Sequence, residues 1–82
     1  MSGKEEIVKA CVLVRVRPGH HFNVAKKIAS LHGVRSAFAV MGGADVVATI
    51  EVKGLRALTA LGTQIGNIQD VVITETLVAA EE

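Results

Sequence analysis

The sequence predicts a single α+β domain whose elements follow the order β-α-β-β-α-β, and three observations support this. Some stretches alternate between apolar and polar positions, which is the period of a half-buried strand. Others repeat apolar residues every third or fourth position, the period of an amphipathic helix. Glycines stand between these stretches, and 82 residues leave room for one core only.

The first predicted strand covers residues 8–16. One side carries Val8, Ala10, Val12, Val14 and Val16, and the other carries Lys9, Cys11, Leu13 and Arg15. Pro18 and Gly19 end the strand, because proline lacks an amide donor and glycine permits a turn. The second side is apolar at its centre, so we expect another surface to cover it there.

A helix and a hairpin follow. Residues 21–31 show helical spacing, and Gly33 comes directly after them as a stop signal. Residues 34–41 predict a second strand, and residues 46–52 alternate again as a third. The short glycine-rich segment between these two strands predicts an antiparallel hairpin.

The second half of the chain predicts one more helix and strand. After Gly54, one helical face carries Leu58, Leu61, Ile65 and Ile68. Gly62 and Gly66 weaken this helix by about 1 kcal/mol each relative to alanine, so we expect it to fray or end near Gly66. Residues 71–78 form the last strand, and the pattern leaves open which face Glu75 occupies, since both registers carry apolar residues.

Two successive β-α-β units with right-handed crossovers generate a ferredoxin-like arrangement. Its four-stranded antiparallel sheet has both helices on one face and leaves the other face open. Half of the residues are hydrophobic, and a chain this short buries only about 60% of its unfolded surface. We therefore expect the open face to pair with a second copy of the chain.

Composition argues against several classes of function. The formal net charge is +1, the basic residues form no dense run, and Phe22 and Phe38 are the only aromatics, so we expect no direct contact with nucleic acid. A lone cysteine, Cys11, fits a reducing compartment. The acidic start of the chain and the lack of a run of about 20 apolar residues predict a cytoplasmic protein without a membrane segment.

Two local features are candidate ligand contacts. Gly42, Gly43, Ala44 and Asp45 form a turn whose backbone amides could converge on a carboxylate, or Asp45 could simply cap an ordinary hairpin turn. Thr74 and Thr76 project from one strand face and are either hydroxyl contacts or plain strand residues.

The histidines His20, His21 and His32 have no partners at metal-ligand spacing. Since no nucleophile–base pair stands out either, we expect no enzyme, metal or cofactor.

From residue 10 to residue 78 the chain resembles the effector-binding (RAM) domain of the leucine-responsive regulatory protein/AsnC family. The resemblance rests on Arg17-Pro18-Gly19, on Leu31-His32-Gly33-Val34, on the segment from Val40 to Val46 with its Gly-x-x-Asp turn, and on the late Thr74-Glu75-Thr76-Leu77-Val78. It implies dimers that pair through their sheets and assemble into an octamer or similar ring. It also implies an amino-acid effector between dimers, near residues 42–45, 74 and 76.

The sequence departs from that family in three respects. No helix-turn-helix domain precedes the match, so we expect a stand-alone module that co-assembles with a full-length regulator or senses a metabolite for another partner. Ala44 stands where an aromatic is frequent, and Asp70 where a glycine is common before the last strand. Two alternatives remain open: a small monooxygenase-like enzyme of the dimeric α/β-barrel type, and a purely structural oligomerisation module.

Overall fold

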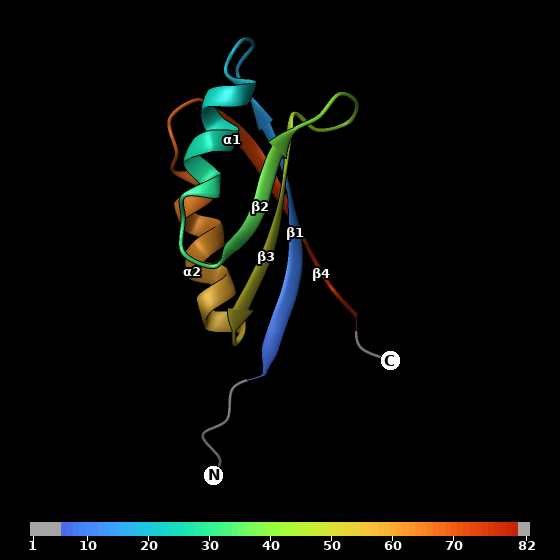
Figure 1. Cartoon of the computed structure of the whole chain (residues 1–82), viewed down its shortest axis with the longest axis vertical. Coiled ribbons are helices and arrows are strands. Elements are labelled where there is room, and N and C mark those ends of the chain that lie inside the picture. The colour runs from blue at the N-terminus through green and yellow to red at the C-terminus, as the bar shows by residue number, and fades with distance from the viewer. Residues whose placement is uncertain (1–5, 81–82) are drawn as a thin grey trace.

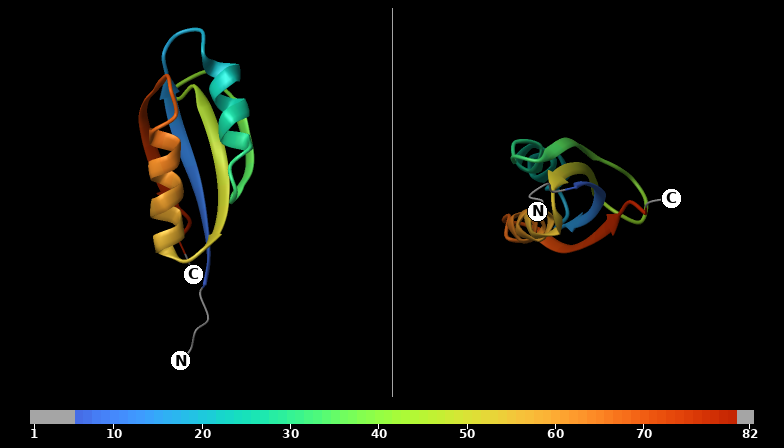
Figure 2. Two further views of the ribbon diagram at one scale, coloured as in Figure 1. Left: turned by 90° about the vertical axis from the view of Figure 1, so that its left-hand side faces the viewer. Right: turned by 90° about the horizontal axis from the view of Figure 1, so that it is seen from below.

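A computed structural model describes residues 6–80 and confirms the element order. Six elements follow one another, β1 (Ile7–Val16), α1 (His21–Ala29), β2 (Val34–Ala39), β3 (Val46–Lys53), α2 (Leu55–Gly66) and β4 (Val71–Val78). The strands form one antiparallel sheet in the order β2-β3-β1-β4. Both helices lie on the same side of it (Figures 1 and 2). Residues 1–5 and 81–82, at the two ends of the chain, lie outside the described part.

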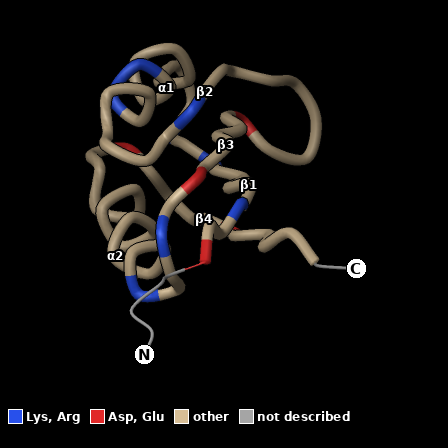
Figure 3. The backbone as a smooth tube through the Cα atoms, turned by 60° about the horizontal axis from the view of Figure 1, so that its bottom comes forward, with Lys and Arg blue, Asp and Glu red and all other residues tan. Residues whose placement is uncertain are grey.

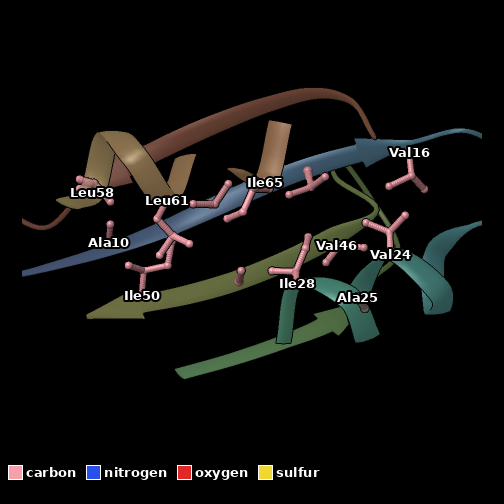
Figure 4. Packing of buried hydrophobic residues seen from close by; sticks show 13 residues of the cluster. Ala10, Val16, Val24, Ala25, Ile28, Val46, Ile50, Leu58, Leu61 and Ile65 are labelled. Carbon is pink, nitrogen blue, oxygen red and sulfur yellow. The ribbon is translucent and has the colours of Figure 1, made fainter. Parts of the chain in front are cut away.

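The core fills the space between the sheet and the helices (Figure 4). It consists of aliphatic side chains from one face of β1 and β3 and from the inner faces of both helices: Ala10, Val12, Val14, Val16, Val24, Ala25, Ile28, Val46, Ala48, Ile50, Leu58, Leu61 and Ile65. The alternation predicted for β1 is confirmed, since its even-numbered residues from Ala10 to Val16 are buried.

Two boundaries differ from the predictions by two residues each. Helix α1 ends at Ala29 instead of residue 31, because Ser30 caps it and tight turns continue the chain, yet Leu31 still packs against the core. Strand β2 ends at Ala39 instead of residue 41. The side chain of Met41 is 99% exposed, so its apolar character did not signal a strand.

The position of Asp70 accounts for its departure from the family pattern. Its φ of 77° lies in the left-handed region, where glycine is favoured and aspartate is tolerated. Its carbonyl accepts the Arg17 amide at 2.9 Å, and its carboxylate lies 3.1 Å from His20 Nδ1 and 3.9 Å from Arg17 Nε. Asp70 thus ties the start of β4 to the β1–α1 loop.

The face of the sheet away from the helices is open. Cross-strand pairing places Leu13 beside Val47 and Glu75, and Cys11 beside Thr49 and Leu77, which settles that Glu75 lies on this face. Charged residues of both signs are spread along the chain (Figure 3). No helix among residues 6–80 is long and apolar enough to cross a membrane.

Candidate functional site

The β2–β3 loop carries the glycine-rich turn at one end of the sheet. It closes the hairpin through a hydrogen bond from the Val40 amide to the Asp45 carbonyl, with an N···O distance of 2.9 Å. The Asp45 amide in turn donates to the carbonyl of Val14 on β1 at 2.8 Å. The loop is therefore closed at its base and fixed to β1, while Gly42 and Gly43 remain exposed.

The carboxylate of Asp45 anchors this loop to the rest of the fold. Its Oδ2 accepts the backbone amide of Val16 at 2.8 Å, and its Oδ1 lies 3.3 Å from Nε2 of His21 at the start of α1. The Val16 hydrogen bond is the main cause that holds the pKa of Asp45 below its ordinary value, and the charges of His21 and Arg15 act in the same direction against partial burial. Neither partner belongs to the turn itself.

A small hollow lies between this loop and the open sheet face. Its volume is about 140 Å³, and it is lined by Leu13, Arg15, Gly43, Ala44, Ile73, Thr74 and Glu75. Three of the residues predicted as ligand contacts, Gly43, Ala44 and Thr74, thus come together although the last is 30 positions away in the sequence. Leu13, Arg15, Ile73 and Glu75 were not predicted, because only the β1–β4 register brings them to the loop.

The two threonines face the helix layer. Thr74 pairs with Val14 and Thr76 with Val12, and both valines are buried under the helices. A groove of about 480 Å³ between α2 and β4 is lined by Leu55, Leu58, Thr59, Gly62, Thr63, Thr74, Thr76 and Val78. Thr74 therefore borders both spaces, whereas Thr76 borders only the groove.

The adjacent histidines His20 and His21 lie against different partners. His20 contacts Asp70, while His21 contacts Asp45, so each serves a different loop. Across residues 6–80 no group of three or more histidine, cysteine, aspartate or glutamate side chains is arranged to hold a metal ion.

These features define a class: a small ferredoxin-like domain with an open sheet face and a hollow where a glycine-rich loop meets it. The sequence model of the Lrp/AsnC ligand binding domain matches residues 9–82. The chain therefore belongs to this family, which consists of ligand-binding domains of regulators and is not an enzyme family. No curated protein matches the sequence.

Solved structures agree with this assignment. The protein TTHA0845 from Thermus thermophilus is 33% identical, with 92% of this chain and 95% of that one covered and a TM-score of 0.86. AsnC of E. coli shares 21% identity over 92% of this chain and 52% of its own, with a TM-score of 0.81. This chain thus spans about half the length of AsnC, and the likeness shows a common fold.

A third solved structure holds an amino acid. The feast or famine regulatory protein Rv3291c from M. tuberculosis, complexed with L-methionine, is 22% identical over 92% of this chain and 51% of its own. Its TM-score of 0.70 shows that the fold is shared.

Proposed function

We propose that this chain is an amino-acid-sensing, self-associating regulatory module. It binds a small amino-acid effector where copies of the chain meet, and it modulates a transcription regulator or another partner. The observation that carries the proposal is the hollow, which gathers Gly43 and Ala44 of the loop and Thr74 of β4 beside the open face. Family membership supports the regulatory role.

The open sheet face supports self-association. Leu13 and Val47 are only half buried at its centre. Phe38, Ile73 and Leu77, at its sides, are between 47% and 61% exposed. A second copy laid against this face would remove these side chains from water, at about 25 cal/mol per Å² of apolar surface. The proposed assembly is a dimer formed through the sheets, with dimers joined into an octamer or similar ring.

The proposed ligand contacts are the glycine-rich loop and the two threonines. Residues 42–45 supply backbone groups at the mouth of the hollow, held in place by the anchored carboxylate of Asp45. Thr74 forms part of the wall, and Thr76 contributes from the adjoining groove. A ligand shared between dimers would stabilise the assembled state by mass action. A full-length regulator of the same family is the proposed partner.

The proposal is tested by calorimetry against the twenty amino acids together with native mass spectrometry. We expect heat with at least one amino acid and a shift of the mass distribution toward larger assemblies. Gly43→Leu should abolish the heat, because Gly43 lines the hollow and a leucine adds bulk there. The fold should tolerate the change, since a Cβ at Gly43 meets no atom within 4 Å. Gly66→Leu, with equally free space, is the control.

The alternative of a purely structural module has its own signature in these measurements. Absence of heat with every amino acid would remove the sensing role. An oligomer whose masses are identical with and without amino acids would point to a purely architectural module.

A further inference from the structure

Strand β4 forms one edge of the sheet and has free backbone groups along that edge. Within the described part of the chain it pairs with β1 alone (Figure 2). The Ala79 amide donates to the Lys9 carbonyl at 2.8 Å, which shows that the odd-numbered residues of this register direct their backbone groups toward β1. Because these groups alternate along a strand, Thr74, Thr76 and Val78 direct theirs outward. Their amides and carbonyls are available to another strand.

The helix layer does not cover this edge. Val12 and Val14 on the helix-facing side of β1 are fully buried. Their neighbours on β4 are less protected, since Thr74 is half-buried and Thr76 is exposed. Val78 on the same side is 49% exposed, and the groove of about 480 Å³ between α2 and β4 lies alongside. A copy laid against the open sheet face would leave this opposite side in water.

The chemistry of the edge favours contact with another uncharged strand. Among residues 6–80, those that line the groove include no charged side chain. Glu75 is the only charged residue of β4, and it lies on the open face. Sheet edges that avoid pairing usually carry lysine, proline or a bulge. Strand β4 has neither lysine nor proline, and its one register shift lies near its start, opposite Arg15 and Val16.

A second copy of β4 meets these requirements. Antiparallel pairing of β4 with itself is isologous, so each copy supplies the same donors and acceptors to the other. Such pairing would also cover Val78 and the neighbouring Leu55 of α2, which is 64% exposed. Two Glu75 side chains directly opposite each other would be destabilising. The register should therefore centre on Thr74 or Thr76, whose backbone groups point outward.

We propose that β4 pairs edge to edge with β4 of a second copy and thereby joins dimers into the larger assembly. The proposal goes beyond the proposed function, and it rests on that function only for the dimer formed through the sheets. The two contacts use different atoms, because the face contact involves the odd-numbered side chains of β4. Two different twofold contacts on each chain let dimers link to one another, as an octamer or similar ring requires.

Native mass spectrometry of Val78→Lys tests the edge contact. The dissociation constant between dimers should rise at least about tenfold, since the burial of a valine is lost and the added charges repel. Dimers held through the sheet face should remain. Asn23→Lys adds the same charge at an exposed position of α1, away from β4 (Figure 2), and should change nothing. Val78→Lys combined with Leu13→Asp should give monomers.

Cross-linking tests the register. Thr74→Cys and Thr76→Cys are each made in a Cys11→Ser background and treated with oxidised glutathione. Directly opposite residues of a hydrogen-bonded antiparallel pair have Cα atoms about 5.5 Å apart, which a disulfide can span. One of the two variants should therefore form a covalent dimer, and Asn23→Cys in the same background should form none.

The outcomes decide for or against the edge contact independently of amino-acid binding. If Val78→Lys behaves like Asn23→Lys and neither threonine position cross-links, self-pairing through β4 is wrong. Assemblies no larger than dimers in the unaltered protein would also overturn it and would leave the edge to a different partner. Circular dichroism shows whether Val78→Lys folds, and if it does not, the cross-links decide. Calorimetry with amino acids tests the sensing function separately.

Discussion

Replacing Gly33 by alanine should destabilise the protein more than the same change at Gly19, Gly42, Gly43, Gly62 or Gly66. Gly33 has a φ of 97°, and a Cβ there would lie 2.8 Å from Cγ1 of Val52 and 3.2 Å from Cδ2 of Leu61. The left-handed backbone costs about 1–2 kcal/mol. The overpacking costs about 1–3 kcal/mol. The loop cannot recede, because the Gly33 carbonyl accepts the Glu51 amide at 3.0 Å.

Urea unfolding at one fixed protein concentration measures the effect, since assembly makes stability depend on concentration. Gly19→Ala is the matched control: its φ is 88°, but a Cβ there meets nothing within 4 Å, so it should lose only the backbone share of about 1–2 kcal/mol. Gly62→Ala lies inside α2 with open space around it and should gain about 1 kcal/mol. Equal midpoints for Gly33→Ala and Gly19→Ala would refute the contact with Val52.

Two further predictions concern the loop anchor and the open face. Asp45→Asn should be less stable than the unaltered protein at neutral pH. The Val16 hydrogen bond holds the pKa of Asp45 below its ordinary value in the folded state, so the ionised carboxylate stabilises the fold, and this contribution is lost as the pH falls through the lowered pKa. The gap between their urea midpoints should therefore narrow as the pH falls below the ordinary range of an aspartate, and a gap independent of pH would contradict the anchor. Leu13→Asp on the open face should raise the dissociation constant of the assembly at least about tenfold, since burying a leucine side chain is worth about 1.5–3 kcal/mol. Light scattering should show no such change for Phe22→Asp, whose side chain is 82% exposed on α1, and equal effects of the two substitutions would argue against association through the sheet.

The elements were predictable wherever one short-range rule sufficed. Alternation identified β1 and β3 because each has one fully buried face, as the burial of Val12, Val14, Val46 and Ala48 shows. The end of α1 was misplaced because Leu31 packs against the core from a turn as well as it would from a helix. Apolar periodicity reflects which side chains pack against the core, and Leu31 does so although it lies beyond the end of the helix.

The face of Glu75 could not be predicted, since it depends on pairing with β1. The register shifts between Arg15 and Val16, and no pattern within β4 encodes that shift. For the same reason the sequence indicated Gly43, Ala44 and Thr74 but not the charged lining of the hollow. A site assembled by strand register is only partly visible in the sequence of any one strand.

Asp45 illustrates the most consequential of these long-range contacts. The sequence was compatible with a turn whose amides bind a carboxylate or with a hairpin turn that Asp45 caps. In the structure the carboxylate of Asp45 bonds Val16, 29 positions away, and His21, and not its own turn. Removing it would therefore release the loop from β1 and α1 together, so a loss of binding in Asp45→Ala would not distinguish a ligand contact from a displaced loop. Gly43→Leu separates the two, because it adds bulk at the edge of the hollow and changes none of the groups that anchor Asp45.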